Sequence, residues 1–244
     1  MSLITLADEE QNHLHKTFEK YKPYTSLADA TVELFGGMVV SVRVPAPSFV
    51  AFYSQAKKHS ALGFFSLMRG HRSQYKLTLR YFLEALVQAA YASFHTDHSE
   101  YFDTESMQPI KQKVVVRRAN KWLFDTYPTV SAHIKEIKDR INNLSSHSNF
   151  VSTFMNFKLA DDGTHDTPFF DYENELVTKA DLLECTRVAS IAIDLLLACS
   201  KDTGLIVLWP ETQKSWGELS HHTDDLFAEL TADPRWAQFI DDEE

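Results

Sequence analysis

Long segments of this chain repeat apolar residues every three or four positions, and this period limits the fold more than any other feature. In residues 73–94, Tyr75, Leu79, Phe82 and Leu86 share one such stripe. Side chains with this spacing lie on one face of an α-helix, which has 3.6 residues per turn. The seven glycines leave few positions for the tight turns of a β-rich chain. The pattern therefore predicts a mainly α protein.

Helix-ending and helix-starting residues divide the chain into expected helices. Pro23 should end the first helix, and Gly70 and Gly204 should each follow a later one. Helix starts are expected near the capping residues Ser26, Ser48, Thr178 (with Asp181) and Ser215 (with Glu218). The expected helices cover residues 4–21, 27–35, 49–69, 73–94, 109–124, 128–144, 180–202 and 215–230.

One part of the chain lacks the helical period. Residues 150–177 alternate only loosely, and the turn residues Asp162 and Gly163 stand between two short extended runs. Such an arrangement is typical of a β-hairpin. We therefore expect a single-domain helical bundle over residues 1–244, with a small β-hairpin insertion at 150–177. No fixed-period repeat or low-complexity linker indicates a second domain.

The charge balance limits the classes of partner. The chain has 34 acidic and 24 basic residues, a formal net charge of −10. A net acidic protein does not attract nucleic acid non-specifically, because binding to phosphate depends on lysine and arginine. Five basic residues nevertheless lie close together in the sequence. We interpret them as a solvated helix face, and the alternative is a basic patch that binds a partner. These five residues are Lys111, Lys113, Arg117, Arg118 and Lys121.

Cysteine placement and hydropathy indicate the compartment. Cys185 and Cys199 lie 14 positions apart in one expected helix, which separates them by about 21 Å and excludes a mutual disulfide. Lone thiols suit a reducing compartment. The N-terminal residues do not resemble a signal peptide, and the most apolar stretch is interrupted by Asp194 and too short to span a bilayer. We expect a cytoplasmic protein with no membrane partner.

Two polar residues near the end of the expected helix 128–144 carry the main functional hypothesis. Arg140 and His147 are seven positions apart, so on a helix they project from one side, about 10 Å apart. They border the apolar seam, and Glu136 and Asn143 share that edge. An imidazole moves protons near neutral pH, and a guanidinium stabilises negative charge on phosphate oxygens. These groups suit cleavage of a phosphodiester.

The sequence R-I-N-N-L-S-S-H, from Arg140 to His147, resembles the Arg-x(4–6)-His motif of the HEPN superfamily of all-α proteins. The resemblance covers residues 71–202, which would be the bundle core. It implies a metal-independent endoribonuclease or toxin-type RNA-cleaving protein without a cofactor. His147 would transfer protons, Arg140 would hold the phosphate, and Asn143 and Glu136 would orient them. It also implies a homodimer, an RNA substrate and a protein antitoxin as partners.

A second resemblance lies upstream. Arg80 and Glu84 stand in R-Y-F-L-E-A, which is similar to an Arg-x-x-x-Glu-Ala helix of bacterial helical families related to HEPN proteins. One interpretation is a pair that lines the same cleft as His147. The other is an ordinary intrahelical ion pair between residues four apart.

Structural explanations and other functions stay open. Glu136 and Arg140 are also four residues apart, and a histidine in the last turn favours a helix C-terminus. Ile141 stands where the family usually has a polar residue, which favours a non-catalytic relative. The alternatives are a helical interaction or dimerisation module and a small-ligand-binding bundle. Glu-x-x-His spacings at Glu10 and Glu218 are interpreted as surface residues, so we expect no metal site.

Overall fold

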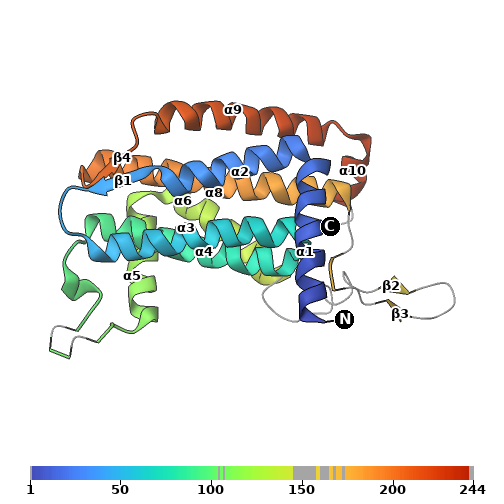
Figure 1. The fold of residues 1–244 in the computed structure, drawn as a ribbon. Helices are drawn as coiled ribbons and strands as arrows, with labels where there is room; N and C mark the ends of the chain where they lie inside the picture. The colour runs from blue at the N-terminus through green and yellow to red at the C-terminus, as the bar shows by residue number, and fades with distance from the viewer. Residues whose placement is uncertain are drawn as a thin grey trace.

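The computed structural model describes residues 2–103, 105–106, 108–144, 158–159, 165–166, 169–171 and 174–241. These residues form a mainly helical bundle with two small antiparallel sheets, as the sequence predicts (Figure 1). The helices are α1 (Leu3–Lys20), α2 (Lys22–Gly37), α3 (Pro47–Met68), α4 (Arg72–Phe94), the 3-10 helix η1 (His98–Glu100), α5 (Gln112–Thr126), α6 (Pro128–Leu144), α8 (Glu175–Thr203), α9 (Thr212–Thr231) and α10 (Pro234–Asp241). The strands are β1 (Val39–Val42), β2 (Lys158–Leu159), β3 (His165–Asp166) and β4 (Ile206–Leu208).

Helix α4 lies at the centre of the bundle. It packs along α3 and also contacts α5, α6 and α8, while α2 and α9 pack on the other side of α8 (Figure 1). The predicted stripe of Tyr75, Leu79, Phe82 and Leu86 is buried, as are most residues of the second half of α4. A helix that contacts neighbours on several sides needs an apolar surface wider than a single stripe. The central position of α4 follows from its sequence.

Both predicted glycine breaks are confirmed. Gly70 lies between α3 and α4 with φ of 77°, and Gly204 ends α8 with φ of 62°. Residues with a Cβ atom rarely adopt this left-handed conformation, so glycine allows the chain to turn sharply at both points. The turn at Gly70 brings the start of α4 back beside the end of α3.

The two sheets differ in how far the sequence predicts them. Strands β2 and β3 pair antiparallel, with Lys158 opposite Asp166, which agrees with the expected hairpin, although its turn at Asp162 and Gly163 lies outside the described residues. Strands β1 and β4 also pair antiparallel, with Val42 opposite Ile206. The sequence gives no sign of this second pairing, because its strands are more than 160 residues apart.

Several predicted helix starts are wrong. Helix α2 begins at Lys22, with Pro23 in its first turn, because the first N–H groups of a helix have no partner inside it and proline is tolerated there. Helix α3 likewise begins at Pro47. Helix α8 begins at Glu175, where Oδ1 of Asn174 accepts from the N–H groups of Leu176 and Val177. Helices α5 and α9 begin at Gln112 and Thr212.

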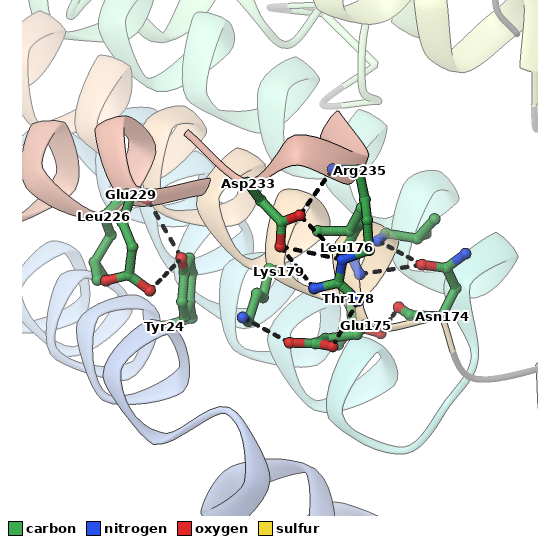
Figure 2. A network of polar contacts seen from close by, with 11 residues as sticks. Tyr24, Asn174, Glu175, Leu176, Thr178, Lys179, Leu226, Glu229, Asp233 and Arg235 are labelled. Atoms are coloured by element: carbon green, nitrogen blue, oxygen red, sulfur yellow. Dashed lines mark hydrogen bonds and ion pairs between the residues drawn. The ribbon is translucent and has the colours of Figure 1, made fainter. Parts of the chain in front are cut away.

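A polar network joins the C-terminal helix to the body (Figure 2). Arg235 at the start of α10 donates to Asp233 at 2.6 Å and to Glu175 of α8 at 3.2 Å. Glu175 also accepts from Lys179 at 2.8 Å, and the Lys179 ammonium lies over the ring of Tyr24 on α2. Arg235 lowers the pKa of Asp233 to about 2. The network links α2, α8 and α10.

Two further expectations concern α8 and membranes. Cys185 and Cys199 are both buried free thiols on α8, and burial raises the pKa of each to about 12. Within the described residues, no helix has both the length and the apolar character that a membrane span requires.

Candidate functional site

Helix α6 places Arg140 at the border of a buried seam. Ile134, Ile137 and Ile141 are buried, as their spacing predicts. Nη2 of Arg140 lies 3.1 Å from Oε1 of Glu184 on α8. The Arg140 side chain is 51% exposed, whereas that of Glu184 is 15% exposed. A half-buried carboxylate on the neighbouring helix therefore holds a guanidinium that is still open to solvent.

Glu184 belongs to a cluster of charges between α4 and α8. Lys76 contacts Glu184 and lies 2.8 Å from Oδ1 of Asp181. Nε of Arg72 donates to Oδ2 of Asp181 at 2.5 Å. We call Arg72, Lys76, Arg140, Asp181 and Glu184 the charge cluster. Asp181 is 4% exposed, so its charge is stable only because two cations replace the lost water.

Tyr75 closes the cluster from the core side. Its hydroxyl donates to the backbone oxygen of Asp181 at 3.2 Å and to Oε2 of Glu184 at 3.3 Å. Burial and the nearby Glu184 carboxylate raise the pKa of Tyr75 well above its usual value. Tyr75 is therefore a fixed hydrogen-bond donor.

Arg80 extends the polar contacts one turn further along α4. Its Nε lies 3.2 Å from Oε1 of Glu84, which is the ion pair expected from residues four apart. Its Nη1 also donates to Oδ1 of Asn142 on α6 at 2.5 Å. Burial lowers the pKa of Lys138, which faces Glu84 and Arg80. Arg80 is thus both an intrahelical partner and a link between α4 and α6.

The predicted site residues are only partly brought together. Arg140, Arg80 and Glu84 take part in contacts among α4, α6 and α8. Glu136 is exposed on α6, and the ion pair of Arg140 is made with Glu184. Asn143 lies in α6, but its side chain and all of His147 lie outside the described residues. The relation of Arg140 to His147 stays a prediction.

The C-terminal end of the insertion packs against the start of α4. Phe170 stacks on His13 of α1 with ring centroids 4.4 Å apart, and on His71 at 5.6 Å. Nε2 of His71 lies 2.9 Å from Oε1 of Glu10. Oδ2 of Asp171 accepts from the backbone N–H of Arg72. The chain that leaves α6 after Arg140 therefore comes back to the end of α4 that carries the charge cluster.

These contacts also account for one Glu-x-x-His spacing. Glu10 pairs with His71 and His13 stacks on a phenylalanine, so neither needs a metal. Across the part of the chain that the structure describes, no group of three histidine, cysteine, aspartate or glutamate residues is suited to a metal ion.

Sequence reasoning missed most of the charge cluster. The sequence pattern predicts Asp181 as the capping partner of Thr178, but Asp181 lies inside α8 and pairs with two cations from α4. A signal was present: Arg72, Lys76 and Arg80 repeat every four residues, and Asp181 and Glu184 are three apart. Two such rows of opposite charge on helices that lie side by side can form ion pairs.

A shallow depression does not support the small-ligand hypothesis. It lies among α4, α5 and α6, lined by Glu84, Gln88, Val116, Asn120 and Lys138, and leaves no room for a water molecule.

Comparison with protein-family models, curated proteins and solved structures returns no match for this chain.

Proposed function

We propose that this chain is a HEPN-like helical protein that cleaves RNA without a metal ion. His147 is the proton-transfer group and Arg140 is the phosphate-binding group of the proposed site. The observation that supports this most is the Arg140 guanidinium, which Glu184 fixes on one side while about half of the side chain stays exposed. A fixed but accessible guanidinium suits phosphate recognition.

The proposed reaction uses the RNA's own 2′-hydroxyl. The 2′-oxygen forms a bond to phosphorus while the bond from phosphorus to the 5′-oxygen breaks. His147 takes the proton from the 2′-hydroxyl, and the leaving 5′-oxygen takes a proton from water. Arg140 stabilises the negative charge that develops on the phosphate oxygens. Glu184 positions Arg140, and Glu136 and Asn143 belong to the same proposed edge.

The proposal includes partners and a location. A second copy of the chain would bring a second Arg140–His147 motif, and a protein antitoxin would block it. An RNA-cleaving protein with unpaired thiols belongs in the cytoplasm, where both RNA and a reducing environment are found.

An RNA-cleavage assay tests the proposal. We expect His147→Ala and Arg140→Ala to lose most activity on single-stranded RNA in the presence of a metal chelator. The matched controls are His222→Ala and Arg43→Ala, which remove the same side chains from exposed positions on α9 and just after β1. They should cleave like the wild type. If all four variants cleave at the wild-type rate, the assignment of the site is wrong.

A second candidate function is a non-catalytic interaction module. Large apolar side chains are exposed on the outer faces of α3 and α4: Leu62, Phe65, Leu77 and Tyr81. An exposed apolar face of this kind often marks a protein contact. In the same assay this candidate predicts no cleavage by any form of the protein.

A further inference from the structure

The outer face of α5 carries a row of exposed basic side chains. Lys113, Arg117 and Lys121 are spaced four apart, and Phe124 follows three residues later. At 100° per residue, these four side chains project within an arc of about 80°. All four are exposed, whereas the opposite side of the helix is buried through Val115, Ala119 and Leu123.

Phe124 distinguishes this row from an ordinary solvated face. Phe124 is 64% exposed, whereas Trp122, two residues earlier, packs against the rings of Phe94 and Tyr127. An exposed phenylalanine beside three cations is the combination with which proteins bind single strands, because cations contact phosphates and the ring stacks on a base.

The charges of the row are accessible. Lys121 lies 2.7 Å from Oδ2 of Asp125, but the two side chains are 76% and 52% exposed. An ion pair this exposed is weak and competes poorly with a phosphate. The remaining α5 cation, Arg118, lies outside the row and contacts Glu100. Three cations and a ring are therefore concentrated on one face of a protein whose formal net charge is −10.

The row begins near the proposed site. Val116 and Asn120 of α5 line the same depression as Lys138 of α6, and Arg140 lies two residues beyond Lys138. The Lys113–Arg117 end of α5 thus lies along the end of α6, whereas the Arg140 side chain, about 200° around α6 from Lys138, projects towards Glu184 of α8. In Figure 1, α5 lies at the periphery of the bundle, where a long ligand can reach it.

We propose that the outer face of α5 is a docking surface for single-stranded RNA, from which the strand continues across the end of α6 that carries Arg140. Lys113, Arg117 and Lys121 contact successive phosphates, and Phe124 stacks on a base. This inference rests on the proposed function for its substrate, and it adds a binding surface outside the proposed catalytic residues.

Binding of a fluorescein-labelled single-stranded RNA, measured by anisotropy, tests the inference. The binding protein is the His147→Ala form, so that cleavage does not interfere. The test variant carries Lys113→Gln, Arg117→Gln and Lys121→Gln. The control carries Lys16→Gln, Lys201→Gln and Lys214→Gln, which are exposed on α1, α8 and α9. Both change the formal net charge from −10 to −13 by removing three positive charges, so the net charge is the same and the location of the removed charges differs.

The salt dependence gives a quantitative expectation. Each phosphate contact to a single strand contributes about 0.7 to the slope of log affinity against log salt. The test variant should therefore lose about 2 from the slope, and the control should keep it. Phe124→Ala should weaken binding about tenfold without changing the slope, because stacking involves no counterion release.

Equal affinity and slope in the test and control variants would overturn the docking surface, and so would no RNA binding by the parent protein at low salt. Displacement of the labelled RNA by poly-glutamate as effectively as by unlabelled RNA would also overturn it. The outcome is separate from that of the proposed function. RNA binding that depends on α5, without any cleavage by the wild type, would leave the docking surface standing and remove the nuclease.

Discussion

Replacing the buried carboxylate of the charge cluster should destabilise the protein strongly. Asp181→Asn keeps the size of the side chain but removes the charge that Arg72 and Lys76 contact. Removal of one partner from a buried ion pair typically costs about 3–5 kcal/mol. Arg72 is 29% exposed and Lys76 keeps Glu184 as a partner, so we expect about 2–4 kcal/mol. For a chain of this length that corresponds to a fall of roughly 4–16 °C in Tm.

Urea unfolding followed by circular dichroism measures this loss. The midpoint should fall while the slope with urea stays the same, because the folded structure exposes the same surface on unfolding. The matched control is Asp125→Asn, which breaks the exposed pair with Lys121 and should cost less than about 1 kcal/mol. In a protein that already carries Arg72→Met, Asp181→Asn should lower the free energy of unfolding by less than it does in the wild type, because one of the two cations that Asp181 contacts is already gone. A loss as small as that of the control would refute the claim that Asp181 is a buried charge that depends on Arg72 and Lys76.

Four further substitutions test local contacts and backbone geometry. Asn174→Ala should cost about 1 kcal/mol, because the N-terminus of α8 loses its side-chain cap; thermal melts measure it. Gly204 has φ of 62°, so Gly204→Ala should destabilise the protein by about 1–2 kcal/mol. Gly217 lies inside α9, where an added Cβ meets nothing within 4 Å, so Gly217→Ala should stabilise it by about 0.5–1 kcal/mol. If both substitutions changed the free energy of unfolding in the same direction, this reasoning would be contradicted. The pKa of Asp233 is lowered from 3.8 to about 2 by Arg235, so its stabilising effect is complete above pH 3.8 and is lost as the pH falls towards 2. The Tm difference between wild type and Asp233→Asn should therefore be constant near neutral pH and shrink below pH 3.8; a difference independent of pH would argue against the Arg235 contact.

The fold could be predicted where burial dictates the sequence. The α4 stripe and the α6 seam follow from the need to bury one helix face. Their buried residues recur every three or four positions, so the helical period can be seen directly in the sequence. Helix starts were less predictable, since serine, threonine and asparagine all suit a cap and only tertiary packing decides which is used. At α8 the cap is Asn174, four residues before Thr178. The pairing of β1 with β4 is a contact between distant segments, for which a single sequence contains no local signal.

The candidate site could be predicted only in part. The spacing of Arg80 and Glu84 was sufficient to expect their ion pair, because both lie on one helix. The partner of Arg140 could not be found this way, since Glu184 lies on another helix 44 residues away in the chain. Buried ion pairs between helices depend on which faces meet, and the sequence of either helix alone does not determine that.

The ratio of the RNA-cleavage rates of wild type and His147→Ala, measured with a chelator present and at equal fraction folded, tests the central claim most directly. A positioned proton-transfer group contributes typically about 10²–10⁴ to a rate, and the proposed function predicts a ratio in that range. A ratio near one, with RNA cut equally by both proteins, would contradict it.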